Sequence, residues 1–339
     1  MLGSLNAPRR QTVNTRNKIL IGIAIALVAL LVVAYFGAGY TIYDKLGNVT
    51  GSCDEHQANR PDSFALSPDW PADFNVTPYF MSPYEPVTFP SRQPGFEVAG
   101  WWIPNKAAEP AAPAVIVLDG LGGCKNSISA LVPAGMLWRN GFNVLVIDVR
   151  DTGESTFDDL RSTIGNDEYH DVLGAWDWLV NEKDFAPASV GIFANSLGGA
   201  MANYAFSEEP RMAALFLHAT FGDLQQIIKA ELTRNGFPTF LSFPTLAMGS
   251  LVTGENLFTR SPLETIRAAA GRPVYIIHSR ADTRIDSTQS ELLAAAAQAA
   301  GVKVTTWFPE NGEHMQIPAA YPQEFEQRLV SFFSENLKQ

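Results

Sequence analysis

This sequence has few cysteines, and it has fewer basic than acidic residues. Only two cysteines, Cys53 and Cys124, occur in 339 residues, which excludes a cysteine-rich metal centre and a framework of several disulfides. Two states are compatible with these two cysteines: one disulfide, or two free thiols. No histidines or carboxylates have the spacing of metal ligands, so neither a metal nor another cofactor is expected. The 24 Lys and Arg stand against 35 Asp and Glu, so nucleic acid is not an expected partner.

Charge is also missing from one long stretch near the N-terminus. Residues 19–43 are uncharged and mostly Ile, Leu, Val and Ala. This stretch is long enough to cross a bilayer as a helix, because about 20 apolar residues suffice. We predict a tail at 1–18, a transmembrane helix at 19–43 and a stalk or packed strap at 44–84. A secretory signal peptide cleaved after 37–39 is the alternative, although its apolar stretch is usually only about 7–15 residues.

The flanks of this span predict its orientation. Arg9, Arg10, Arg16 and Lys18 precede it without any acidic residue, and every acidic residue of the chain follows it. Because basic residues concentrate on the cytoplasmic side, we expect the N-terminus inside and the rest of the chain outside the cell membrane.

A short apolar segment further along ends in a serine between small residues. Residues 190–199 read Val-Gly-Ile-Phe-Ala-Asn-Ser-Leu-Gly-Gly, which places Ser196 two residues after Ala194 and two before Gly198. A serine on a sharp strand-to-helix turn requires such neighbours, because larger side chains would clash where the chain folds back. The pattern predicts that Ser196 is a nucleophile. The alternative is that its hydroxyl caps the following helix.

Other apolar segments end in residue types that suit a serine nucleophile. They are Val115–Gly123, Asn143–Ser155, Val274–Asp282 and Lys303–His314. Loops that follow parallel strands meet at one edge of the sheet, so we expect Asp282 and His314 beside Ser196. Asp286 is the alternative acid. A phosphate-binding loop at 120–123 is disfavoured, because no Gly-Lys-Ser/Thr follows it.

Taken in order, these segments resemble the α/β-hydrolase superfamily, in its esterase, lipase and peptidase-like branch. The family motifs His-Gly-x, Asp-x-Arg-Gly-x-Gly-x-Ser, His-Gly-x-x-Asp and Gly-x-His correspond to residues 119–121, 148–155, 278–282 and 312–314, within a resemblance over roughly 85–337. The departures are Asp119 for His and Asp151, Ser279 and Ala194 for Gly, and every catalytic group is retained. The resemblance implies an α/β fold with a mostly parallel, doubly wound sheet in a domain at 85–339.

The resemblance also implies a mechanism. His314 would take the proton of Ser196, and Asp282 would orient the imidazole. The backbone N–H groups of Leu121 and Leu197 would stabilise the oxyanion. We expect cleavage of a small-molecule or lipid-like carboxylic ester with an apolar acyl group. A peptidase, thioesterase or acyltransferase would use the same residues, and a non-catalytic envelope protein is a further alternative; the sequence indicates no protein partner.

The expected helices follow the later strands, and one region interrupts this alternation. Helices are predicted at 126–140, 168–182, 197–206, 288–300 and 323–337, after an antiparallel pair of strands at 87–90 and 96–103.

The interrupting region, about 221–260, lies where family members insert a cap. It carries apolar residues at every third position: Phe237, Phe240, Phe243 and Leu246. Pro238 and Pro244 are expected to break a helix there. These side chains form either an apolar lid over Ser196 or packing on the core, and a capping box at 261–264 restarts the regular fold.

Overall fold

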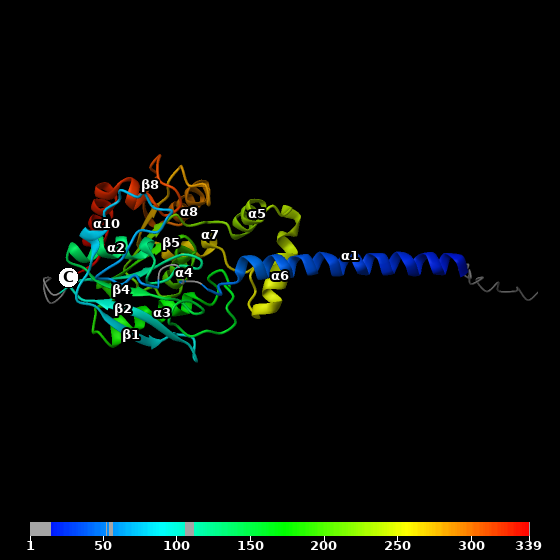
Figure 1. Ribbon diagram of the computed structural model, residues 1–339, viewed down its shortest axis with the longest axis horizontal. Helices are drawn as coiled ribbons and strands as arrows, with labels where there is room; N and C mark the ends of the chain where they lie inside the picture. The colour runs from blue at the N-terminus through cyan, green and yellow to red at the C-terminus, as the bar shows by residue number, and fades with distance from the viewer. Residues whose placement is uncertain (1–14, 52, 54–56, 106–111, 339) are drawn as a thin grey trace, which may run out of the picture.

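The computed structural model describes residues 15–51, 53, 57–105 and 112–338. One long helix, α1 (Thr15–Gly47), projects from a body that is built around a single sheet (Figure 1). The predicted span at 19–43 lies inside α1, which is long and apolar enough to cross a membrane, with none of its most apolar stretch buried. Arg9, Arg10 and His56 lie outside the described residues.

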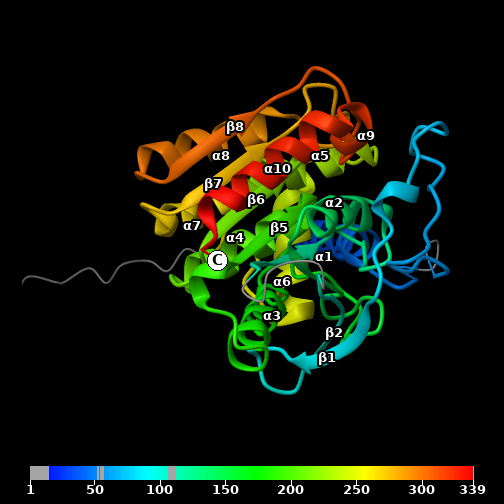
Figure 2. The same cartoon turned by 90° about the vertical axis from the view of Figure 1, so that its left-hand side faces the viewer.

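The sheet has eight strands, and it is mostly parallel as predicted. They are β1 (Glu85–Pro90), β2 (Glu97–Ile103), β3 (Ala114–Leu118), β4 (Asn143–Ile147), β5 (Val190–Asn195), β6 (Ala214–His218), β7 (Pro273–Ile277) and β8 (Lys303–Trp307). Their order is β1-β2-β4-β3-β5-β6-β7-β8, and β2 pairs antiparallel with both β1 and β4. Figure 2 shows β7 and β8 at one side of the sheet and β1 and β2 at the other.

The central strands are apolar on both faces because helices cover both. In β3, Ile116 and Leu118 belong to one core cluster, whereas Val115 and Val117 belong to the other. Side chains of α3, α4 and α8 fill the first cluster, and side chains of α2 and α10 fill the second. This two-sided burial explains the uninterrupted apolar runs in the sequence.

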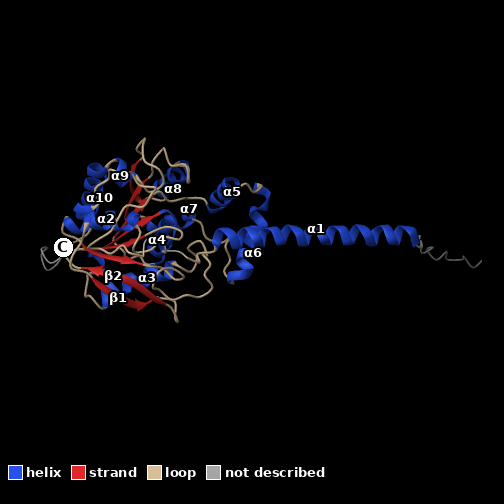
Figure 3. Cartoon of the chain, in the orientation of Figure 1, coloured by secondary structure: helices blue, strands red, loops and turns tan. Residues whose placement is uncertain are grey.

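The helices between the strands begin and end close to the predicted positions. They are α2 (Ile128–Arg139), α3 (Tyr169–Asn181), α4 (Ser196–Glu208), α8 (Thr288–Ala299) and α10 (Pro322–Asn336). The described residues also form two short helices, α7 (Pro262–Thr265) and α9 (Ile317–Ala320), and four 3₁₀ turns, η2 (Thr77–Tyr79), η3 (Pro187–Ser189), η4 (Thr239–Leu241) and η5 (Ile266–Ala269) (Figure 3).

The segment between α1 and the sheet is packed on the body. Phe64, Trp70, Tyr79 and Met81 are buried in the core cluster that also contains α2 and α10. Of the two alternatives, stalk or strap, the described residues of this segment therefore form a strap.

The cap consists of α5 (Leu224–Arg234), η4 and α6 (Ser242–Thr253), and two local expectations about it were wrong. Pro244 does not break the helix, because it occupies the first turn of α6, where the missing N–H has no helical partner to lose. Ser261 forms no capping box, because its hydroxyl donates instead to the carbonyl oxygen of Gly222.

Candidate active site

Ser196 lies at the junction of β5 and α4, on a backbone that only a tight turn produces. Its φ is +49°, in the left-handed region that non-glycine residues seldom adopt. A Cβ at Gly198 would lie 2.2 Å from the carbonyl oxygen of Asp119, and a Cβ at Gly120 would lie 2.8 Å from Cβ of Ser196. The small residues around the serine are therefore required by the packing, as the elbow pattern predicts.

Three side chains from three different loops meet in a hydrogen-bonded series. Nε2 of His314, in the loop after β8, lies 2.9 Å from Oγ of Ser196. Nδ1 of the same ring lies 2.7 Å from Oδ2 of Asp282, in the loop after β7. The structure thus brings together the three residues that the sequence predicts as nucleophile, base and acid, with a geometry suited to proton transfer from the hydroxyl to the imidazole.

Asp282 is held as a carboxylate by four hydrogen bonds. Besides His314, Nε2 of His278 lies 2.9 Å from Oδ2, and the backbone N–H groups of Arg284 and Ile285 donate to Oδ1. Burial alone would raise the pKa of Asp282, but the hydrogen bonds from the two histidines outweigh it and lower the pKa below its ordinary value. The alternative acid, Asp286, accepts instead from the N–H of Thr288.

The predicted oxyanion donors are positioned around the serine. Leu121 lies in the turn after β3, and it lines the same cavities as Ser196. Leu197 is the second residue of α4, so its N–H has no carbonyl one turn earlier within the helix. The role of both amides as oxyanion donors remains a prediction.

Behind the serine lies a buried polar network that the sequence did not reveal. Asn195 Nδ2 lies 3.2 Å from Oδ1 of Asp119, which replaces the family's histidine, and Oδ2 of this aspartate accepts from Ser129. On its other side, Asn195 Oδ1 lies 2.8 Å from Nδ1 of His218. Burial, and to a smaller degree the nearby histidines, lower the pKa of His218 to about 3, so this imidazole is neutral at pH 7. An aspartate directly before the glycine-rich turn was the only sequence signal of this network.

Two cavities meet at Ser196, and they differ in chemistry. A cavity of about 480 Å³ lies over the strap and the glycine-rich turn, with Asp69 and Asp119 in its wall. A second cavity of about 320 Å³ lies under the cap and is lined mainly by apolar groups, among them Phe221, Ile227 and Leu246. Leu121, Ser196 and Arg284 border both. The nucleophile therefore lies between a polar and an apolar chamber.

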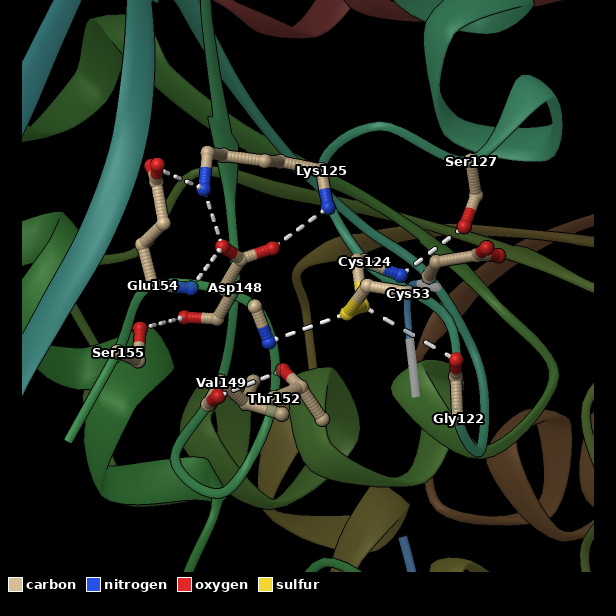
Figure 4. Close-up of a disulfide and its surroundings, with 12 residues drawn as sticks. Cys53, Gly122, Cys124, Lys125, Ser127, Asp148, Val149, Thr152, Glu154 and Ser155 are labelled. Atoms are coloured by element: carbon tan, nitrogen blue, oxygen red, sulfur yellow. Dashed lines mark hydrogen bonds and ion pairs between the residues drawn. A yellow bond between two sulfur atoms is a disulfide. The ribbon is translucent and has the colours of Figure 1, made fainter. Parts of the chain in front are cut away.

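The strap is joined to the glycine-rich turn by a disulfide. Cys53 and Cys124 are bonded, with Cα atoms 5.7 Å apart, so of the two alternatives for the cysteines the structure contains the disulfide (Figure 4). Beside it, the backbone N–H of Lys125 donates to Asp148, and the Lys125 ammonium pairs with the carboxylates of Asp148 and Glu154. These contacts fix the chain directly after the turn that carries Leu121. Within the described ranges no group of three or more His, Cys, Asp or Glu side chains is arranged to hold a metal.

Comparison with known proteins supports this description. The sequence model of the prolyl oligopeptidase family matches residues 133–339. Two curated proteins of Mycobacterium tuberculosis, Uncharacterized protein Rv2307c and Uncharacterized protein MT2364, are each 28% identical over 205 residues. The match covers 60% of this chain and 64% of each relative, so it spans slightly less than two thirds of their length.

Solved structures share the fold. The Pyrococcus furiosus esterase Pf2001 superposes with a TM-score of 0.62 at 18% identity, covering 78% of this chain and 97% of the esterase. The Pyrococcus horikoshii acylaminoacyl peptidase gives a TM-score of 0.56 at 19% identity, covering 76% of this chain and 42% of the peptidase.

Proposed function

Because the chain belongs to the prolyl oligopeptidase family of α/β-fold serine hydrolases, we propose that it is a membrane-anchored esterase that acts outside the cytoplasm on esters with an apolar acyl group. The observation that carries the proposal is the apolar cavity of about 320 Å³ that opens directly onto Ser196. This cavity favours binding of an acyl chain, because the transfer of apolar surface out of water is favourable by about 25 cal/mol per Å².

The hydrogen-bonded series supports an acyl-enzyme mechanism. His314 takes the proton from Oγ of Ser196 as this oxygen attacks the ester carbonyl, and the resulting oxyanion faces the N–H groups of Leu121 and Leu197. The same imidazole then gives its proton to the departing alcohol oxygen. Water attacks the acyl-enzyme with His314 again as base, which releases the acid and regenerates the hydroxyl. Asp282 keeps the imidazole oriented and stabilises its protonated form.

The two chambers support a division of the substrate at the scissile bond. The acyl part would occupy the apolar chamber under the cap, and the alcohol part would enter the polar chamber beside the strap. In the wall of the polar chamber, the carboxylates of Asp69 and Asp119 outnumber the single guanidinium of Arg284, so like-charge repulsion disfavours an anionic group close to the nucleophile. We therefore expect neutral or cationic alcohol groups to be preferred over anionic ones.

Two features support an anchor with the catalytic domain on the outer side. The exposed, uncharged part of α1 requires a lipid environment, and the basic residues that precede it favour the cytoplasmic side for the N-terminus. Disulfides such as Cys53–Cys124 persist in oxidising compartments, in agreement with an outward-facing domain.

The test is a comparison of esters with amides of the same acyl group. Purified full-length protein in detergent is assayed with p-nitrophenyl esters of two to eight carbons and with the matching p-nitroanilides. We expect kcat/KM to rise with acyl length and to exceed that of the anilides at every length. Faster cleavage of aminoacyl anilides than of any ester would favour a peptidase and contradict the proposal.

A further inference from the structure

One part of the cap, residues 237–253, is apolar and uncharged, which is unusual for a surface beside an aqueous active site. Residues 237–253 contain no charged side chain. Phe240 and Phe243 are 66% and 55% exposed, and Leu251 is 74% exposed. Neither phenylalanine lines a cavity that contains Ser196, so the expectation that they form a lid over the serine, or pack in the core, was wrong for these two residues.

The phenylalanines instead contact the apolar helix α1. The ring of Tyr35 stacks on that of Phe240 with centroids 6.4 Å apart, and its hydroxyl donates to the Phe240 carbonyl oxygen. Phe36 meets Phe243 edge to face. A Cβ at Gly39 would lie 2.5 Å from the carbonyl carbon of Pro244, so the absence of a side chain at Gly39 permits the two helices to touch. Figure 1 shows α6 crossing α1 at a steep angle beyond the main body.

These contacts fix the depth of the cap along α1. Lys18 is the last charged residue before the apolar stretch, which begins at Ile19. A hydrocarbon core of about 30 Å accommodates about 20 helical residues, and the span therefore ends near Ala38. The contacts of Phe240 and Phe243 lie at Tyr35 and Phe36, within the last turn of that span. When α1 crosses a bilayer, the exposed phenylalanines consequently lie at the level of the outermost hydrocarbon.

The inner face of the same segment borders the active site. Thr245 and Leu246 of α6 line the apolar chamber together with Tyr43 and Leu46 from the end of α1. The chamber wall is thus built from the end of α1 and from a helix, α6, that also carries the exposed Phe243 and Leu251.

We propose that the cap is a second membrane-binding element, seated in the hydrocarbon edge of the bilayer, and that ester substrates pass from the lipid into the apolar chamber beside the contact between α1 and α6. The occupant of the exposed cap face is lipid hydrocarbon, because this face adjoins the exposed apolar surface of α1, and neither residues 19–43 nor residues 237–253 contain a charged side chain. The membrane contact rests on the proposed crossing of the bilayer by α1 together with the contacts between α1 and the cap, and the identity of the substrate as a membrane-resident acyl ester rests on the proposed hydrolase activity.

The membrane contact is tested by measuring depth. Full-length protein carrying Phe240→Cys is labelled with a nitrobenzoxadiazole fluorophore and reconstituted in phosphatidylcholine nanodiscs. Leu292→Cys, at an exposed leucine of α8, is the matched control. Cys53 and Cys124 are bonded to each other and do not react. We expect lipids with a doxyl group near the glycerol to quench the label at 240, and aqueous iodide to quench only the label at 292. Equal iodide quenching at both positions overturns the membrane contact.

Entry from the lipid is tested by activity on two substrates. The double variant Phe240→Ser/Phe243→Ser is compared with Leu292→Ser in nanodiscs, using p-nitrophenyl palmitate in the bilayer and p-nitrophenyl acetate in solution. Loss of the cap's hydrocarbon contact should lower kcat/KM for the palmitate by about ten-fold or more and leave the acetate unaffected. Equal effects on the two esters, or none, overturn entry from the lipid. Wild-type protein that hydrolyses neither ester contradicts the proposed function instead, and the depth measurement still decides the membrane contact.

Discussion

Among single residues, Asp282 and its hydrogen-bond partners are central to the proposed mechanism. Its two oxygens accept hydrogen bonds from two imidazoles and two backbone N–H groups, so an ionised carboxylate is favoured in a position that is almost fully buried. His278 is itself buried; its Nδ1 lies 2.7 Å from Oγ of Ser290, and its Nε2 lies 2.9 Å from Oδ2 of Asp282. His278 is therefore a positioning residue for the acid, a role that its place at the end of β7 did not reveal.

The assignment of the acid predicts a large difference between two similar substitutions. Asp282→Asn should lower kcat for ester hydrolysis by about 10⁴-fold, because the amide no longer holds the correct tautomer of His314. Asp286→Asn should change kcat less than about two-fold, since this side chain contacts only the start of α8. Steady-state kinetics on the purified variants decide the matter, and the opposite ranking would move the acid to residue 286.

The buried imidazole of His218 predicts a dependence of stability on pH. Its pKa is lowered from 6.5 to about 3, so the unfolded chain binds a proton between these values that the folded protein does not. Stability from this residue is therefore present above pH 6.5 and is lost as the pH falls toward 3.

Replacing the imidazole should remove this dependence. Between pH 7 and 4.5, wild type should lose about 2–3 kcal/mol more than His218→Gln, measured by urea unfolding at each pH. His170→Gln is the control, because that ring is only half buried. Parallel pH profiles for wild type and His218→Gln would show that His218 titrates normally.

At the scale of elements, the disulfide joins two segments that both border the nucleophile. It links the strap to the turn between β3 and α2 across a separation of 71 residues. Closing a loop of this length restricts the unfolded chain by about 4 kcal/mol in the chain-entropy account.

Removal of the disulfide should therefore affect stability and catalysis together. Cys53→Ser/Cys124→Ser should lose up to about 4 kcal/mol of unfolding free energy and should also lower kcat, because the turn that carries Leu121 loses its tether. Denaturant unfolding and ester kinetics provide the two measurements, and reduced wild-type protein should behave like the variant. A stable variant with full activity would show that the tether is dispensable.

The regular elements were predictable, and the cap was not. Strands such as β3 and β5 are apolar throughout because both faces are covered, and this pattern is visible in sequence. The small residues around Ser196 likewise report a local steric requirement. The orientation of Phe240 and Phe243 depends instead on contact with α1, some 200 residues earlier. Local spacing carries no information on this contact, so the three-residue repeat suggested a lid.

For the whole molecule, we propose that the catalytic domain lies outside the cytoplasm. A reporter enzyme that works only outside should be active when fused after Gln339, because the basic residues are retained on the cytoplasmic side of the span. Protease added to intact spheroplasts should then remove the catalytic domain. Protection of the domain in intact spheroplasts, with digestion after lysis, would reverse the orientation.

In the proposed arrangement, one helix and the cap hold a hydrolase body close to a membrane. Every step of the proposed chemistry depends on Ser196 being a nucleophile that His314 activates, 2.9 Å away. The left-handed backbone of Ser196 and the two cavities beside it are relevant to catalysis only if Ser196 is the nucleophile.

The most direct measurement is therefore reaction with a fluorophosphonate, followed by peptide mass spectrometry. Wild-type protein should gain one phosphonate, located on Ser196, and lose ester hydrolysis in proportion to labelling. Ser196→Ala should remain unlabelled, and His314→Ala should label more slowly by about 10³-fold or more, because the hydroxyl has lost its base. Labelling at another residue, or full ester turnover by Ser196→Ala, would contradict the account.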